Sequence, residues 1–390
     1  MKNHQLFKAI GLMSGTSMDG IDVAWIETDG MFLVRSLGNF SVSYDKSYYT
    51  EMKLLEQSMN ELVKNPEFSS SFLIKEINQK VDVLHARAVL GLCDKYKIEQ
   101  KNREIIGYHG QTVYHLPAQK LSIQLGNPQH LSQFLNMPVV GNIRQKDLQE
   151  GGQGAPVAPI YHQALVIRDN LAPAVVINCG GITNMTAIWG EGTSDLLGFD
   201  VGPGNGLLDR WVYEKTQGRE SMDKDGRYAL AGKVHPVVLQ DLYAHSCWIQ
   251  GKNYYENSPP KSLDIRDFSW TPALNSLSLE DGCATLAAFT AYCIVKAFRW
   301  ISKPLRYAIL VGGGWHNPFI LETLKQEIAF QYGENICVVR GDEVGWSVQY
   351  LEAELMAYLA VRRLKNQPIT FPMTTGVAQP LVGGEIFYPN

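Results

Sequence analysis

Two short glycine-rich segments have the composition of phosphate-binding turns. Residues 15–22 read GTSMDGID, and residues 178–184 read NCGGITN. Turns of this kind direct backbone N–H groups and hydroxyls toward one point, which suits phosphate oxygens. Neither carries the Gly-Lys-Ser/Thr of a Walker A loop, and each taken alone is also typical of an ordinary hairpin turn. Together, the two turns predict a site that binds a triphosphate from both sides.

Asp200 is the strongest candidate for a catalytic side chain. It lies within residues 198–205, GFDVGPGN, between apolar residues and a constrained Gly-Pro-Gly. A carboxylate held in this way can act as a general base toward a bound hydroxyl or water. The alternative is an aspartate whose oxygens are satisfied by turn amides.

Gly312, Gly313 and Gly314 follow an apolar, strand-like run at residues 307–311. Glycines let a flat ligand such as a purine approach the backbone closely. A structural turn explains the run as well. The Gly-x-Gly-x-x-Gly spacing of a dinucleotide-binding fold is absent, so a Rossmann site is disfavoured.

Two further polar residues, His109 and Gln111, follow an apolar run at residues 105–108. The end of a strand is a common place for ligand contacts. His109 and His115 are six residues apart, which does not fit the spacing of a helical metal-ligand pair, so we expect no metal there. A solvated loop histidine is the alternative for His109.

The elements that position these residues form two similar α/β arrangements. The chain opens with three strands around the hairpin dipeptide Asp29-Gly30, and a second pair of strands surrounds the turn at 178–184. Three strands before any helix disfavour an NAD-dependent dehydrogenase, whose fold needs a helix after its first strand. We expect strands at 7–13, 21–28, 31–44, 105–108, 139–140, 174–177, 185–189 and 307–311, and helices at 47–64, 71–98, 281–300 and 346–364.

Composition limits the class of protein. The chain has 390 residues, a net charge of -4, 45% hydrophobic and 19% charged residues, which indicates a globular protein of two lobes. Near-neutral charge disfavours nucleic acid as a partner, and the lack of an apolar run of 18 residues predicts no membrane span. The six cysteines form no C-x-x-C pair. With no secretory signal at the start, they predict reduced thiols in a cytoplasmic protein.

Six motifs in order resemble one enzyme family. They are LMSGTSMDGID at 12–22, GYHGQT at 107–112, EGGQGAP at 150–156, NCGGITN at 178–184, GFDVGPGN at 198–205 and VGGGWHNP at 311–318. Together they resemble anhydro-N-acetylmuramic acid kinase, a family of the actin/hexokinase/Hsp70-like ATPase superfamily. The likeness runs from residue 9 to the C-terminal tail.

The resemblance implies an α/β, two-lobed actin-like (ribonuclease H-like) ATPase fold with mixed sheets and an interlobe active-site cleft. The N-terminal lobe is expected at 1–135, completed by 365–390, and the C-terminal lobe at 136–364. ATP and Mg²⁺ are the implied cofactors. The nucleotide contacts expected are Gly15, Thr16, Ser17, Met18, Asp19, Gly20, Ile21, Asp22, Asn178, Gly180, Gly181, Asn184, Gly312, Gly313, Gly314 and Asn317, of which Asp19 and Asp22 hold Mg²⁺ through waters.

The resemblance also implies the reaction. Asp200 activates a water that opens the 1,6-anhydro bridge of 1,6-anhydro-N-acetylmuramic acid. The freed O6 then takes the γ-phosphate of ATP to give N-acetylmuramic acid 6-phosphate and ADP, a step of peptidoglycan recycling. The expected sugar contacts are His109, Gln111, Lys146 and Glu352.

One departure from the family pattern keeps an alternative open. Lys146 stands where family members commonly carry the last arginine of Phe-Arg-Arg-Arg-Asp, and lysine is a point charge without a bidentate fork. A kinase for another 1,6-anhydro sugar such as levoglucosan is therefore the nearest alternative. An actin- or Hsp70-like ATPase module without sugar chemistry is disfavoured, since no peptide-binding domain follows. A homodimer is left open.

Overall fold

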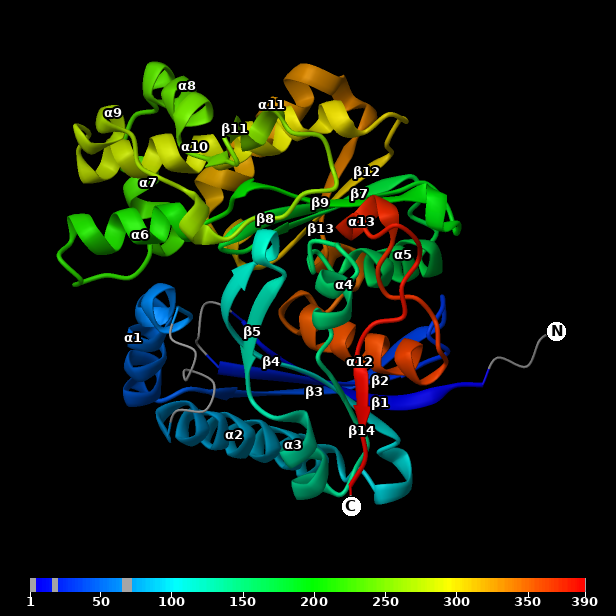
Figure 1. Cartoon of the computed structure of the whole chain (residues 1–390). Coiled ribbons are helices and arrows are strands. Elements are labelled where there is room, and N and C mark those ends of the chain that lie inside the picture. Colours follow the sequence, from blue (N-terminus) through cyan, green and yellow to red (C-terminus); the bar gives the residue numbers. More distant parts are fainter. Residues whose placement is uncertain (1–4, 16–19, 65–71, 390) are drawn as a thin grey trace. The chain divides into compact units, whose positions relative to one another are not determined.

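The computed structural model describes residues 5–15, 20–64 and 72–389. It divides into two compact units (Figure 1). Unit 1 comprises Met1–Asp169 and Gln349–Asn390, and unit 2 comprises Asn170–Val348.

The sheet of unit 1 has the strand order β14-β6-β4-β1-β2-β3, with β5 paired to β4. Neighbours β1, β2 and β3 are antiparallel, whereas β4 and β6 continue the sheet parallel to β1. The three opening strands expected from the sequence are thus confirmed. The bounds are β1 (Phe7–Ser14), β2 (Gly20–Thr28), β3 (Val34–Ser43), β4 (Ile105–Leu116), β5 (Leu121–Leu125), β6 (Val139–Gly141) and β14 (Glu385–Phe387).

Helices cover both faces of this sheet (Figure 1). Ile10 and Leu12 of β1 pack against Val89 and Leu92 of α2 on one face. On the other face α12 lies so close that a Cβ at Gly11 would come within 1.9 Å of the Ala353 carbonyl oxygen. The helices of unit 1 are α1 (Lys46–Leu62), α2 (Phe72–Tyr96), α3 (Pro128–Leu135), α4 (Gln145–Gln149), α5 (Pro159–Arg168), α12 (Leu351–Leu364) and α13 (Pro372–Thr375).

The division between the units differs from the one expected at residues 135 and 364. Residues 136–169 and 349–364 belong to unit 1. The short strand β6 hydrogen-bonds to β4 and β14, and α12 packs on the central strands of the same sheet. These long-range contacts, which sequence periodicity does not reveal, decide where the units separate.

Unit 2 repeats the topology of unit 1. Its sheet has the order β9-β8-β7-β12-β13, in which β7, β8 and β9 are antiparallel and β12 and β13 lie parallel to β7. The corresponding order in unit 1 is β3-β2-β1-β4-β6. Two α/β units with this mixed sheet confirm the actin-like fold expected from the sequence. The strands are β7 (Ala174–Cys179), β8 (Ile182–Ile188), β9 (Leu196–Pro203), β12 (Tyr307–Val311) and β13 (Cys337–Arg340).

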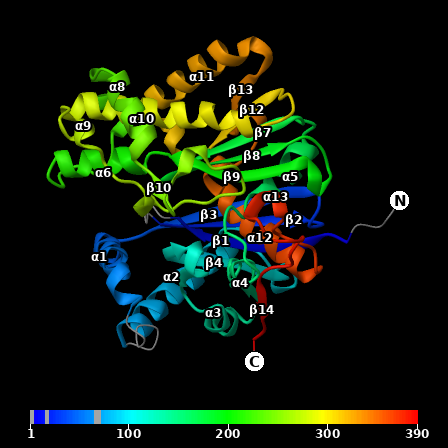
Figure 2. The same ribbon diagram turned by 45° about the horizontal axis from the view of Figure 1, so that its top comes forward.

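A long apolar helix, α10, forms the centre of the unit 2 core and runs along its sheet (Figure 2). The run Leu279–Trp300 is long and apolar enough to cross a membrane, but 83% of its apolar window is buried inside the protein, so we assign it to the core. The other elements are α6 (Gly206–Lys215), α7 (Arg227–Ala231), α8 (Pro236–His245), α9 (Pro272–Asn275), α10 (Leu279–Ala297), α11 (Pro318–Tyr332) and the small strands β10 (Trp248–Ile249) and β11 (Lys252–Asn253).

Candidate active site

The first glycine-rich turn joins β1 to β2 in unit 1. Four of its expected contacts, Thr16, Ser17, Met18 and Asp19, lie outside the described residues. Gly20 begins β2 where a Cβ would approach the Val42 carbonyl oxygen to 2.4 Å, so only glycine fits there. Ile21 is buried in the core, and any contact it makes with a ligand is therefore through its backbone.

Gln111 supports this turn from β4. Its side chain is fully buried, accepts a hydrogen bond from the Ser14 hydroxyl and donates one to the Gly15 carbonyl oxygen at 3.2 Å. Asp22, at the other end of the turn, accepts a hydrogen bond from the Ser41 hydroxyl at 2.5 Å. Gln111 thus fixes the base of the turn, and Asp22 presents a carboxylate beside it.

His109 lies inside β4 rather than in a loop after a strand, because β4 continues to Leu116. Its Nδ1 lies 3.1 Å from the Gly110 carbonyl oxygen, and its Nε2 accepts a hydrogen bond from Arg144 Nε at 3.1 Å. Burial, with the nearby Arg144 charge, lowers the pKa of His109 to about 3. The alternative of a solvated loop histidine is therefore wrong: His109 is buried and neutral and orients Arg144, which in turn donates to the Gly154 carbonyl oxygen at 2.7 Å.

Asp147 fastens the EGGQGAP loop to the C-terminal part of unit 1. Its carboxylate, 1% exposed, accepts hydrogen bonds from Gly154 N at 2.7 Å and from the Thr375 hydroxyl at 2.6 Å. Lys146, the residue before it, is exposed. One buried carboxylate therefore holds the loop to the residues around Thr375.

Two glutamates of α12 have different surroundings. Glu352, an expected sugar contact, is exposed in the first turn of the helix. Glu354 is 4% exposed and accepts a hydrogen bond from the Tyr161 hydroxyl at 2.8 Å, and burial raises its pKa. Of the two, only Glu352 presents its side chain to solvent.

The second glycine-rich turn, in unit 2, is the two-residue connection of Gly180 and Gly181 between β7 and β8. Its carbonyl oxygens accept N–H groups from residues that begin α6: Gly180 from Asn205 at 2.8 Å, and Gly181 from Gly204 at 3.0 Å and Gly206 at 3.2 Å. The carbonyl oxygens of the turn are therefore fastened by backbone hydrogen bonds to the segment that leads into α6.

Asp200 lies in a row of polar side chains across the unit 2 sheet. Asn178 of β7 pairs with Asn184 of β8, which pairs with Asp200 of β9. Directly paired residues share a face of the sheet. The flanking residues Met185 and Phe199 lie on the opposite face, in the core. Asn184 Oδ1 is buried without a hydrogen-bond partner in the described part of the chain.

The Asp200 residue is held at three points by a segment that sequence motifs did not indicate. Its N–H donates to the Lys261 carbonyl oxygen at 3.0 Å, its carbonyl oxygen accepts from the Tyr254 hydroxyl at 2.7 Å, and its Oδ2 accepts from Leu263 N at 2.8 Å. The only sequence signal was Pro259-Pro260 before Lys261, which indicates a loop but no function.

The glycine run at the end of β12 combines tight packing with one open position. A Cβ at Gly312 would approach Asn178 Oδ1 to 2.4 Å, and one at Gly314 would approach Cys179 Sγ to 2.3 Å. Gly313 has nothing within 4 Å of its Cβ position, so a ligand can reach the backbone there. Asn317 caps α11 through Phe319 N at 3.0 Å, so its side chain shapes the segment.

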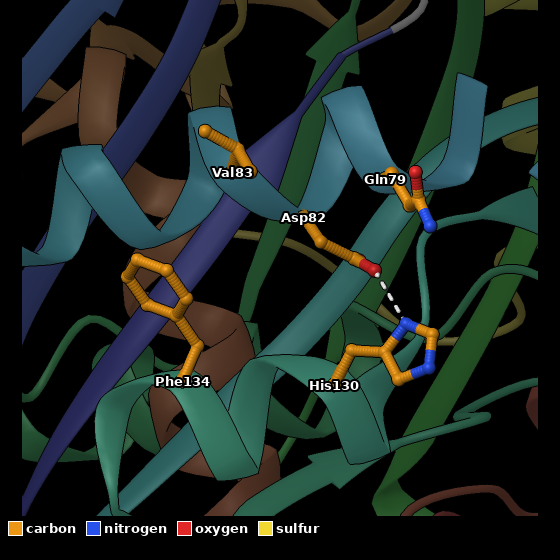
Figure 3. A pocket seen from close by; sticks show the side chains of 5 residues that line it. All are labelled: Gln79, Asp82, Val83, His130 and Phe134. Atoms are coloured by element: carbon orange, nitrogen blue, oxygen red, sulfur yellow. Dashed lines mark hydrogen bonds and ion pairs between the residues drawn. The ribbon is translucent and has the colours of Figure 1, made fainter. Parts of the chain in front are cut away.

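Two cavities of unit 1 contain none of the expected site residues. The one in Figure 3, of about 260 Å³, lies between α2 and α3 and is lined by Asp82, His130 and Phe134, among others. His130 Nδ1 points toward Asp82 Oδ2 at 3.3 Å. Burial raises the pKa of Asp82 to about 6. Within the described ranges, no three His, Cys, Asp or Glu side chains gather into a metal site.

A family model described as anhydro-N-acetylmuramic acid kinase matches residues 7–389. The chain belongs to the anhydro-N-acetylmuramic acid kinase family. A protein of that name from Methylobacterium nodulans is 40% identical over 386 residues, covering 97% of this chain and 98% of the relative. Another, from Rhodopseudomonas palustris, is 38% identical over 395 residues and covers 98% of this chain and all of the relative (100%).

Membership of the anhydro-N-acetylmuramic acid kinase family confirms the resemblance carried by the six motifs, and with it the expected class of ATP-dependent sugar kinase. Neither relative is named for levoglucosan. Among solved structures, a ROK hexokinase from Thermus thermophilus aligns with a TM-score of 0.41 and 12% identity over 92% of this chain and 100% of that chain. A similarity that low carries no argument about function.

Proposed function

We propose that this kinase opens the 1,6-anhydro bridge of 1,6-anhydro-N-acetylmuramic acid with water and phosphorylates O6, giving N-acetylmuramic acid 6-phosphate and ADP. The observation that carries the proposal is Asp200, a carboxylate fixed through both backbone and side chain. It stands on the sheet face that bears Asn178 and Asn184, beside the Gly180-Gly181 turn. We further propose that the reaction takes place in the cytoplasm.

In the first half of the reaction Asp200 takes a proton from a water molecule while the water oxygen bonds to the anomeric carbon. The bond from that carbon to the bridging oxygen breaks. The freed O6 attacks the γ-phosphorus of ATP, the bond to the β–γ bridging oxygen breaks, and ADP leaves. One water and one ATP are consumed, and the proton held by Asp200 returns to solvent.

The nucleotide contacts follow from the two turns. We assign the phosphates to the backbone of Gly15, Gly20, Gly180 and Gly181, and the adenosine to the open position at Gly313, which Gly312 and Gly314 allow by packing on β7. Asn178 and Asn184 flank the Gly180-Gly181 turn on β7 and β8, and we assign their amides to the nucleotide as well. The phosphate role of residues 16–19 follows from their sequence alone.

Mg²⁺ neutralises charge on the phosphates when bound. Asp22, with the Ser41 hydroxyl beside it, is an oxygen donor of the kind that Mg²⁺ prefers, and we assign it and Asp19 to holding the ion through waters.

On the sugar side, Lys146 and Glu352 are the exposed charged side chains among the residues expected to contact the substrate. We propose that the Lys146 ammonium binds the lactyl carboxylate of the sugar by charge attraction, without the two parallel hydrogen bonds that an arginine would make. We assign His109 and Gln111 no direct contact with the sugar. The His109 ring is hydrogen-bonded to Arg144, and the Gln111 amide is hydrogen-bonded to Ser14 and Gly15.

The reaction is tested by mass spectrometry of products made in ¹⁸O-labelled water. We expect one labelled oxygen in the phosphorylated sugar and none in ADP or free phosphate. Unlabelled product incubated in the same water controls for exchange at the anomeric hydroxyl. Label in free phosphate, with ADP release that does not depend on sugar, would contradict the proposal and support an ATPase module. Comparable turnover of levoglucosan would support the alternative sugar.

A further inference from the structure

Residues 254–263 of unit 2 enclose Asp200 with three hydrogen bonds. Two involve its backbone, with the Lys261 carbonyl oxygen and the Tyr254 hydroxyl, and one involves its carboxylate, with Leu263 N. Asp200, Tyr254, Lys261 and Leu263 are all buried, with exposures of 6%, 2%, 7% and 7%. Hydrogen bonds shielded from water in this way hold a side chain to one orientation.

The buried Lys261 ammonium joins the two ends of this segment. Its Nζ donates to the Tyr254 carbonyl oxygen at 3.0 Å and lies 4.3 Å from the centre of the Tyr254 ring. It makes no ion pair with a carboxylate of the described chain. Burial, with the nearby Arg299 charge, lowers the pKa of Lys261 to about 8. A buried ammonium without a carboxylate partner costs stability, so packing alone does not explain a lysine here.

We propose that Tyr254 and Lys261 are positioning residues that hold Asp200 in its reactive orientation. Tyr254 anchors the Asp200 backbone, and Lys261 keeps Tyr254 in place while its own carbonyl oxygen accepts the Asp200 N–H. Neither residue is assigned a contact with the substrates. The inference rests on the proposed role of Asp200 as the general base.

Tyr254→Phe tests the inference because it removes one hydroxyl and little volume. The matched control is Tyr255→Phe, since Tyr255 is also buried but its hydroxyl bonds to Ser246 Oγ at 2.9 Å, not to Asp200. We expect similar drops in the unfolding midpoint for both variants. Only Tyr254→Phe should lose turnover, about tenfold, with the KM values for ATP and sugar within twofold, because loss of one buried hydrogen bond is worth about that factor.

The pH profile of kcat/KM adds a readout that a purely structural role would not change. In Tyr254→Phe the acid limb should move to higher pH, because a carboxylate less firmly held against an N–H donor is protonated more readily. Equal losses of turnover in the two tyrosine variants, or none in Tyr254→Phe, would overturn the inference. Wild-type turnover in Asp200→Asn would instead overturn the proposed base, whatever the tyrosine variants do.

Lys261→Met supplies the second test, since methionine keeps an apolar stem of similar length. We expect a variant at least as stable as the natural chain that turns over about fivefold more slowly. Stability and activity would then change in opposite directions, which is the signature of a residue kept for function. A less stable variant with unchanged turnover would assign Lys261 to the core and overturn its positioning role.

Discussion

The two glycine-rich hairpins occupy equivalent places in sheets of the same topology but are supported differently. In unit 2 the carbonyl oxygens of Gly180 and Gly181 accept N–H groups from the start of α6, so backbone holds backbone. In unit 1 the side chain of Gln111 reaches from β4 to Ser14 and Gly15. Both turns need a glycine where the backbone is crowded, at Gly20 in unit 1 and at Gly204 in unit 2, but only the unit 1 turn is also held by a side chain from another strand.

The two units also differ in the residues that pair across their three antiparallel strands. In unit 2 the row runs from Asn178 through Asn184 to Asp200, with the carboxylate on the third strand. In unit 1 a row of the same kind runs from Met13 through Asp22 to Ser41, with the carboxylate on the second strand. The repeated topology fixes where a turn and a row of side chains lie, and the residues in the row decide what chemistry is done there.

Among variants that test the comparison of the two turns, the largest effect is expected in unit 2, where the turn is held by backbone hydrogen bonds. A Cβ in Gly204→Ala would approach the Gly180 carbonyl oxygen to 1.9 Å, so the unit 2 turn must move. We expect ATP affinity to fall at least tenfold, together with a loss of about 1–3 kcal/mol in unfolding free energy. Titration calorimetry with ATP and denaturant unfolding measure the two.

Gly313→Ala is the matched variant, since nothing of the protein lies within 4 Å of its Cβ position. We expect weaker ATP binding with unchanged stability. If Gly204→Ala binds ATP as tightly as the natural chain does, the unit 2 turn does not contact the phosphates.

Unit 1 is tested through Asp147, the buried carboxylate that holds Gly154 N and the Thr375 hydroxyl. Asp147→Ala leaves both donors without an acceptor, and we expect a loss of about 2–3 kcal/mol and a KM for the sugar raised severalfold. Asp147→Asn keeps one acceptor oxygen and should recover part of both losses. If the KM for ATP rises more than the KM for the sugar, the loop contacts the nucleotide and not the sugar.

A smaller effect is expected from the buried histidines. Burial lowers the pKa of His162 to about 3, so the folded protein keeps it neutral while the unfolded chain protonates it near pH 6.5. The unfolded state then binds more protons between these values, and stability falls as the pH drops from about 6.5 toward 3.

His162→Gln should flatten this part of the stability profile by up to about 1.4 kcal/mol per pH unit, as measured by denaturant unfolding between pH 4 and 8. An unchanged slope would mean that His162 does not titrate on unfolding as described.

Much of the fold followed from the sequence because its signals are local. The Asp29-Gly30 hairpin and the periodic helix α2 were predicted to within a few residues. The unit boundaries were wrong because the three-residue strand β6 and the attachment of α12 depend on partners distant in the chain. The helix expected from residue 346 begins at Leu351, since the preceding residues form 3₁₀ turns.

The same distinction holds for the site. Motifs located Asp200 and both turns, since glycine spacing and flanking strands are written in neighbouring residues. They did not indicate Tyr254 or Lys261, which reach Asp200 only through folding of a segment more than 50 residues later. The motifs also singled out Gln111, but they did not show that its side chain holds a turn. A glutamine that holds a turn cannot be told from one that binds a ligand by sequence alone.

The most direct measurement compares Asp200→Asn with Asp195→Asn. Asp195 is a partly exposed aspartate of the same hairpin, paired with Lys303 at 3.3 Å. With the base removed, phosphorylation of the anhydro sugar should fall by about 10²–10⁴ while the Kd for ATP stays within twofold, and the control should keep full activity. Turnover in Asp200→Asn close to that of the natural chain would contradict the account.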